Sequence, residues 1–234
     1  GGKFYPQGHP LHNEESIEIK QMTAKEEDML TSRTLLKKGI AIDRVLQSLI
    51  VNKRIDPDSL FVGDRNAIIV ATRVSGYGND YTTTVTCPAC SAQQKYSFDL
   101  NDAEVFCGDP SPERGVIDNC DGTFNTTLPR SKVDVTFKLL TGRDEKRLID
   151  GIESDRKRKI TERTVTRQLV NIITAANGDS SPQALQYLIE NLPSIDSRHL
   201  RLVYKVVAPN VDLTQNFSCE ECDHEQDMEV PLNA

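Results

Sequence analysis

Two cysteine pairs in matching surroundings constrain the fold of this chain more than any other feature. Cys87 and Cys90 form one C-x-x-C pair, and Cys219 and Cys222 form a second pair 132 residues later. The same shift superposes three apolar positions, Tyr96 on Met228, Phe98 on Val230 and Leu100 on Leu232. β-Branched or aromatic residues precede the first pair, and alternating apolar residues follow each pair. The sequence therefore predicts two equivalent β-hairpins with cysteines at their turns.

Four thiols on two facing turns are the ligand set of a tetrahedral structural metal site. We predict one Zn²⁺ bound by Cys87, Cys90, Cys219 and Cys222, in a zinc ribbon split between the two hairpins. A closed set of four thiolates leaves no coordination position for water or substrate, so the metal would stabilise the fold. It would also tie the C-terminal region to the middle of the chain.

Other interpretations of the cysteines are weaker. A redox C-x-x-C normally opens a helix, whereas residues 91–93 lead into a predicted strand, which disfavours a thiol oxidoreductase. His224 is an alternative ligand to Cys222, but Cys222 occupies the repeated position. Cys107 and Cys120 lie in a loop without other ligands; two free thiols are the simplest interpretation, and no role is assigned to them.

The rest of the chain combines helical and strand patterns, which predicts an α+β fold: a helical domain with an inserted and a terminal β-hairpin. Thr23 and Glu26 form a capping box that predicts a helix start. Residues 107–131 are predicted to be a loop. The expected segments are an extended N-terminal arm (1–22), a helical segment (23–80), the first zinc hairpin with a β region and loop (81–140), C-terminal helices (141–208) and the second zinc hairpin (209–234).

The N-terminal arm is expected to pack on a different chain. It lacks helical or strand periodicity, and its apolar residues are too dispersed to build a core alone. These residues are Phe4, Tyr5, Leu11, Ile17 and Ile19.

Charge limits the classes of partner. The 234 residues include 35 acidic and 28 basic side chains, a net charge of −7. The second hairpin repels phosphates, because it carries six acidic residues and no basic one between Cys219 and Val230. The basic residues 156–159 alternate with acidic neighbours and are interpreted as a solvated face rather than an RNA or acidic-partner site. The longest apolar stretch, residues 67–71, is far below the roughly 20 residues of a membrane helix.

No catalytic constellation is apparent in the sequence. The four histidines pair with no convincing nucleophile, and the G-x-S-x-G, P-loop and H-E-x-x-H motifs are absent. Residues 141–145 form a polar group, but a helix start with acidic residues in its first turn explains them. We therefore expect no enzymatic activity.

The order of short motifs along the chain resembles one protein family. Residues 63–68, 73–78, 81–90 and 98–100, followed by 128–129 and 133–145, are similar to the baseplate hub subunit and hub assembly family of T-even-type contractile-tailed bacteriophages. The similarity spans roughly residues 25–232, with a longer insertion at residues 107–131.

This resemblance implies a structural component of the phage tail baseplate. It implies a role in hub and wedge assembly through contacts with other baseplate and tail proteins, in the virion and in the host cytoplasm during assembly. It implies no catalytic residues. The alternative is a zinc-ribbon regulator that binds nucleic acid, which would require the cations near residues 156–159 to form a continuous basic stripe.

Overall fold

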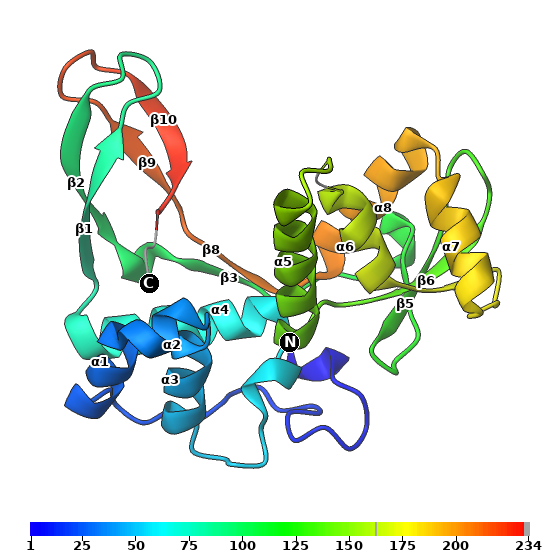
Figure 1. The fold of residues 1–234 in the computed structure, drawn as a ribbon, viewed down its shortest axis with the longest axis horizontal. Coiled ribbons are helices and arrows are strands. Elements are labelled where there is room, and N and C mark those ends of the chain that lie inside the picture. The colour runs from blue at the N-terminus through cyan, green and yellow to red at the C-terminus, as the bar shows by residue number, and fades with distance from the viewer. Residues whose placement is uncertain (162, 232–234) are drawn as a thin grey trace. The chain divides into compact units, whose positions relative to one another are not determined.

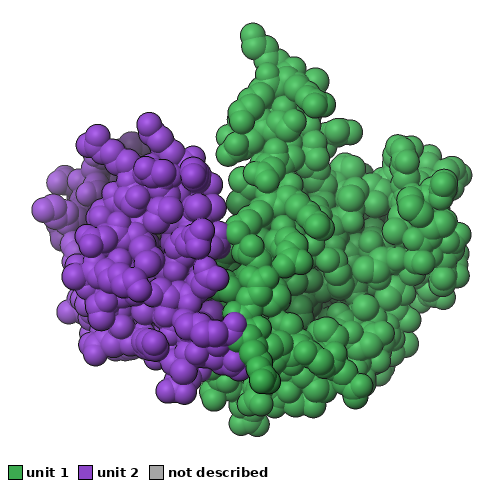
Figure 2. All heavy atoms as spheres, turned by 60° about the horizontal axis from the view of Figure 1, so that its bottom comes forward, with its two compact units in different colours: residues 1–17, 54–65, 107–209 green, residues 18–53, 66–106, 210–234 purple. Residues whose placement is uncertain are grey.

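Helices and small antiparallel sheets alternate along the chain in the computed structural model, which describes residues 1–161 and 163–231 (Figure 1). The expected α+β class is confirmed. The chain divides into two compact units, each made of three segments (Figure 2). Unit 1 contains residues 1–17, 54–65 and 107–209, and unit 2 contains residues 18–53, 66–106 and 210–234.

The described residues of unit 1 form a four-stranded antiparallel sheet, in the order β4-β5-β6-β7, and the helices α5 to α8. Its elements are η1 (Gly2–Phe4), η2 (Pro57–Ser59), η4 (Pro112–Arg114), β4 (Ile117–Asp118), β5 (Thr123–Thr127), β6 (Asp134–Lys138), α5 (Gly142–Lys157), α6 (Thr164–Ile172), β7 (Ile173–Ala176), α7 (Pro182–Glu190) and α8 (Ser194–Val207).

Aromatic side chains form the core of unit 1. Phe124 in β5 and Phe137 in β6 are fully buried, and their ring centroids are 5.5 Å apart. Phe4 packs edge-on against Phe124, with centroids 5.2 Å apart. Tyr5 stacks on Phe61 at 4.1 Å. Such rings bury large apolar areas, so these contacts anchor the sheet and the N-terminal segment together.

The N-terminal segment differs from the expected extended arm, because its residues belong to the two compact units: residues 1–17 to unit 1 and the following residues to unit 2. Phe4, Tyr5 and Leu11 are buried in unit 1. The Tyr5 hydroxyl donates to Asp64 Oδ2 at 2.9 Å and accepts from the amide of Phe61 at 2.9 Å. Residues 18–20 belong to unit 2, where they pair with the end of α3 through an Ile19–Ile50 bridge.

As far as residue 231, unit 2 contains four helices and three two-stranded sheets. Its elements are α1 (Ala24–Thr31), α2 (Arg33–Lys37), α3 (Ala41–Leu49), α4 (Val62–Tyr77, in unit 2 from residue 66), β1 (Asp80–Thr86), β2 (Gln93–Asp99), η3 (Leu100–Asp102), β3 (Glu104–Phe106), β8 (Asn210–Asp212), β9 (Thr214–Ser218) and β10 (Glu225–Glu229).

The short strands β3 and β8 flank the long unit 1 segment, residues 107–209, in the sequence. They pair antiparallel, with Glu104 opposite Asp212 and Phe106 opposite Asn210. The chain therefore leaves unit 2 and returns to it at neighbouring positions. This pairing keeps the two cysteine hairpins in the same unit although residues 107–209 separate them in the sequence.

Two local predictions need correction. The predicted loop at residues 107–131 contains β4 and all of β5, because Ile117–Asp118 pairs with β5 and β5 pairs with β6. Residues 141–208 are expected to be helical, but α6 ends at Ile172 and the chain continues as β7 against β6. In both cases pairing with a sheet overrides the local pattern.

The predicted capping box at Thr23 is confirmed, and it is part of a larger network. Glu26 Oε2 accepts from the Thr23 amide at 3.0 Å, and Glu26 Oε1 accepts from the Ser48 hydroxyl of α3 at 2.6 Å. Glu26 is buried although it carries a charge. The Ser48 hydrogen bond, followed by those from Thr23, lowers the pKa of Glu26 to about 2.

We expect Glu26→Gln to destabilise unit 2 by about 1–2 kcal/mol at neutral pH, the range for a lost cap and charged hydrogen bond. A lowered carboxyl pKa stabilises the fold above the ordinary value near 4.5, and this stabilisation is lost as the pH falls towards 2. Urea unfolding at several pH values should show the difference from wild type shrinking below about pH 5. Asp28→Asn, on the exposed side of the same helix, is the control. A pH-independent difference would contradict this assignment.

Candidate metal centre

The two cysteine hairpins have the same strand register. Thr83 pairs with Tyr96 in the first hairpin, and Gln215 pairs with Met228 in the second. These pairs are related by the 132-residue shift found in the sequence. Leu232, the expected equivalent of Leu100, lies outside the described residues. The repeat therefore extends from the cysteine spacing to the strand pairing.

The two turns also have the same backbone geometry. The Cys87 amide donates to the carbonyl of Ala92, and the Cys219 amide donates to the carbonyl of His224, both at 2.9 Å. Ser91 and Asp223 occupy the same position of the turn, with φ angles of 62° and 53°. Each of their amides donates to the carbonyl of the first cysteine of its pair, at 2.9 and 3.1 Å. This left-handed residue tightens each turn, so both cysteines of a pair face the same side.

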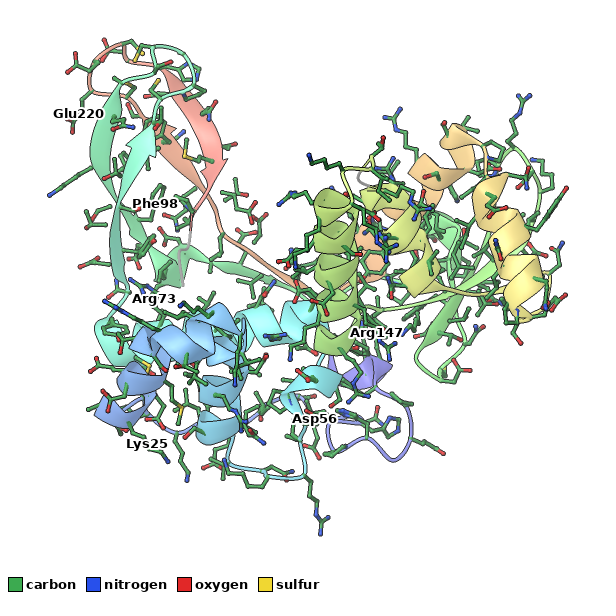
Figure 3. The ribbon with its side chains drawn as sticks, viewed as in Figure 1. Lys25, Asp56, Arg73, Phe98, Arg147 and Glu220 are labelled. Atoms are coloured by element: carbon green, nitrogen blue, oxygen red, sulfur yellow. The ribbon has the colours of Figure 1, made fainter. Side chains whose placement is uncertain are left out.

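An apolar core lies between the hairpins and aligns them. Phe98 from the first hairpin and Phe217 from the second are almost completely buried, and the Tyr96 ring is 5.0 and 5.2 Å from their centroids. Tyr81, Val85, Leu100 and Val230 complete this core, which also contains Cys87 and Cys219. Figure 3 labels Phe98 between the strands and Glu220 at the turns.

The four sulfur atoms meet where the two turns face each other. All four lie within 4.8 Å of one another, with 3.8 Å between Cys87 and Cys222 and 3.7 Å between Cys90 and Cys219. A tetrahedral ion with Zn–S bonds of about 2.3 Å requires sulfur atoms about 3.8 Å apart. The donor set therefore fits a four-coordinate thiolate site.

The pKa values of the thiols also favour binding of a cation at this site. The backbone amide of Cys90 lowers the pKa of Cys87 to about 6. At Cys222 the amide of His224 lowers the pKa, but hydrogen bonds with the other three thiols and burial together raise it to about 12. One negative charge thus makes further ionisation unfavourable. A divalent metal removes this repulsion and displaces the remaining protons.

The other sequence candidates lie outside this cluster. Cys107 and Cys120 are exposed, belong to unit 1 and are not among the clustered ligand groups. His224 Nε2 lies 3.3 Å from Gln226 Oε1, and His224 is not among the clustered ligand groups.

Sequence reasoning did not identify the polar side chains that join the hairpins. Gln94, Tyr96 and Gln215 each contact the backbone of the opposite hairpin. The recurrence of glutamine at positions 94 and 226, related by the same shift, was a signal in the sequence.

A histidine beside a serine in unit 1 is arranged for structure rather than catalysis. His9 Nδ1 accepts from the amide of Leu11 at 3.1 Å, so in the neutral ring the proton lies on Nε2. This nitrogen is 2.9 Å from Ser59 Oγ, and the Ser59 hydroxyl donates to the carbonyl of Asp56 at 2.7 Å. His9 therefore donates to Ser59 and has no free lone pair to remove the hydroxyl proton.

The surface charges follow the pattern expected from the sequence. Glu220, Glu221 and Asp223 at the second turn are exposed, as are the acidic side chains of β10. Among the basic residues at the end of α5, Lys157 lies 3.7 Å from Glu153. Asp155 of the same helix binds Arg167 of α6 in bidentate geometry.

No helix in the described part of the chain combines the length and the apolar character needed to cross a lipid bilayer.

Comparison with known proteins gives a family match over most of the chain. A family model described as T4 bacteriophage base plate protein matches residues 9–231. No curated protein and no solved structure matches the chain. The matched range covers all four clustered cysteines and nearly all of the residues in both units.

Proposed function

Because this chain belongs to the T4 bacteriophage base plate protein family, we propose that it acts as a structural protein in assembly of the baseplate hub and its junction with the wedges. The family places the protein in the tail baseplate of the virion, among other tail proteins, and indicates a non-enzymatic role. In this role the protein provides a stable fold and surfaces that bind neighbouring proteins.

We propose that Cys87, Cys90, Cys219 and Cys222 hold one structural Zn²⁺ and that the two hairpins form a split zinc ribbon. The convergence of four sulfur atoms from two turns of identical geometry carries this proposal. Zn²⁺ accepts four thiolates in a tetrahedron, and such a site stabilises folding without activating water. Within unit 2, this bond would join two hairpins that share no strand pairing.

The charge distribution favours protein partners over nucleic acid. The exposed acidic side chains of the second hairpin would repel phosphates at the end of the ribbon. The exposed Glu153, 3.7 Å from Lys157, interrupts the basic surface at residues 156–159 that a nucleic-acid regulator would need. Weak DNA binding that falls steeply with salt is the expected behaviour.

A phage that lacks this gene tests the proposal by complementation. We expect no normal contractile tails without the protein, full rescue by wild type and by Cys107→Ser/Cys120→Ser, and poor rescue by Cys219→Ser/Cys222→Ser. Electron microscopy of lysates provides the measurement. Normal tails without the protein would refute the assembly role, and full rescue by the Cys219/Cys222 variant would refute a need for the metal.

A further inference from the structure

We propose that Gln94 is a positioning residue of the metal centre, which fixes Cys219 by holding the backbone on both sides of it. This inference rests on the metal site proposed above and adds a residue that binds no metal itself. It assigns to one side chain the task of bringing the ligands of the second hairpin towards those of the first.

Both polar atoms of the Gln94 amide are used in this contact. Nε2 donates to the carbonyl oxygen of Ser218 at 3.1 Å, and Oε1 accepts from the amide of Glu220 at 3.0 Å. Ser218 and Glu220 are the residues immediately before and after Cys219. The planar amide of Gln94 therefore fixes both the position and the orientation of the backbone that carries this ligand.

This contact matters because, among the described residues, no strand of one hairpin pairs with a strand of the other: β1 pairs with β2, and β9 pairs with β10, in two separate two-stranded sheets. The pairing of β3 with β8 joins the two hairpins only at the ends opposite the cysteine turns. Near the turns, side chains therefore hold the two hairpins in line. Tyr96 and Gln215 also bridge the hairpins, but they bind Asn216 and Asp99, which lie farther along the strands from the cysteines.

The internal repeat supplies a matched comparison. Gln226 occupies the position in β10 that Gln94 occupies in β2: Gln226 pairs with Phe217, and Gln94 pairs with Val85. Both residues are half-buried. Gln226 Oε1 faces His224 in its own hairpin, at 3.3 Å, whereas Gln94 contacts the opposite hairpin. The two glutamines are thus equivalent in sequence but not in their contacts.

The test compares Gln94→Met with Gln226→Met, because methionine retains the length of glutamine and lacks both hydrogen-bonding groups. Zinc affinity is measured by competition with a chelator, and the visible spectrum of the Co²⁺-loaded protein reports the tetrahedral geometry. We expect Gln94→Met to bind zinc about 10–100-fold more weakly, the usual effect of losing a group that orients a ligand. Gln226→Met should remain within about twofold of wild type.

The outcomes separate this inference from the metal proposal. If wild-type protein binds no zinc, the metal site itself is refuted. If wild type binds zinc and Gln94→Met binds it equally well with an unchanged Co²⁺ spectrum, only the role of Gln94 is refuted. An equal loss of zinc affinity in Gln94→Met and Gln226→Met would also refute the role of Gln94. The loss would then come from changing a glutamine at this position of either hairpin, and not from the contact of Gln94 with the opposite hairpin. Melting of the zinc-loaded variants shows whether both still fold. Gln94→Glu keeps the acceptor and the shape but loses the donor to Ser218, so it should also bind zinc more weakly than wild type, and wild-type affinity in this variant would refute the role of the donor.

Discussion

Freshly purified protein is expected to contain one zinc ion per chain and to lose the structure of its cysteine hairpins when a strong chelator removes the ion. An isolated two-stranded hairpin is only marginally stable in water, and unit 2 contains two of them side by side. Structural zinc sites contribute on the order of 10 kcal/mol of apparent binding free energy, which is comparable to the whole stability of a domain. Metal analysis measures the zinc content per chain, and thermal melting with and without chelator measures the loss of stability.

Paired cysteine variants separate the metal effect from general thiol chemistry. Cys219→Ser/Cys222→Ser should contain no zinc and should melt at the same temperature with and without chelator. Cys107→Ser/Cys120→Ser removes two exposed thiols outside the cluster and should retain one zinc ion. Zinc retained by the first variant, or zinc lost from the second, would contradict the assignment of the ligands.

Phe4→Ala is expected to destabilise unit 1 by about 3–5 kcal/mol, the usual effect of removing a buried phenyl ring. Phe4 is 1% exposed and packs edge-on against Phe124. A Cβ atom at Gly108 would lie 2.9 Å from the Phe4 ring, so the site is closely packed. Urea unfolding measures the loss, and limited proteolysis should cut within residues 1–17 sooner in the variant.

Phe106→Ala provides the matched control, because this phenylalanine is 40% exposed in unit 2. We expect it to change the free energy of unfolding by about 1 kcal/mol or less. If Phe4→Ala is equally mild, or if wild-type protein is cut rapidly within residues 1–17, then the N-terminal segment is a detached arm and its packing in unit 1 is refuted.

The sequence did not show that apolar residues of the N-terminal segment are buried in unit 1. Phe4, Tyr5 and Leu11 have no common period, so no pattern shows that they face one core. Their partners, Phe124 and Phe61, are distant in the chain. Buried apolar contacts are not directional, and many distant residues are equally suitable partners by chemistry alone.

Features that depend on neighbouring residues could be read from the sequence. The capping box of Thr23 and Glu26 uses groups three residues apart, and the α5 start at Thr141 follows the same rule with Asp144. The cysteine hairpins were predictable because each turn makes its hydrogen bonds within a few residues. The 132-residue repeat then showed that the two turns are equivalent.

Only the tertiary structure decided which distant groups meet. It placed β4 and β5 in a segment that reads as a loop, because strand pairing supplies hydrogen bonds that local propensity does not encode. It closed the inserted segment through β3 and β8, three residues each, which are too short to carry a pattern. It also directed Gln94, and not its repeat partner Gln226, to the opposite hairpin. The sequence by itself determined the local turns and which four cysteines they carry, whereas the long-range contacts depend on packing that involves the whole unit.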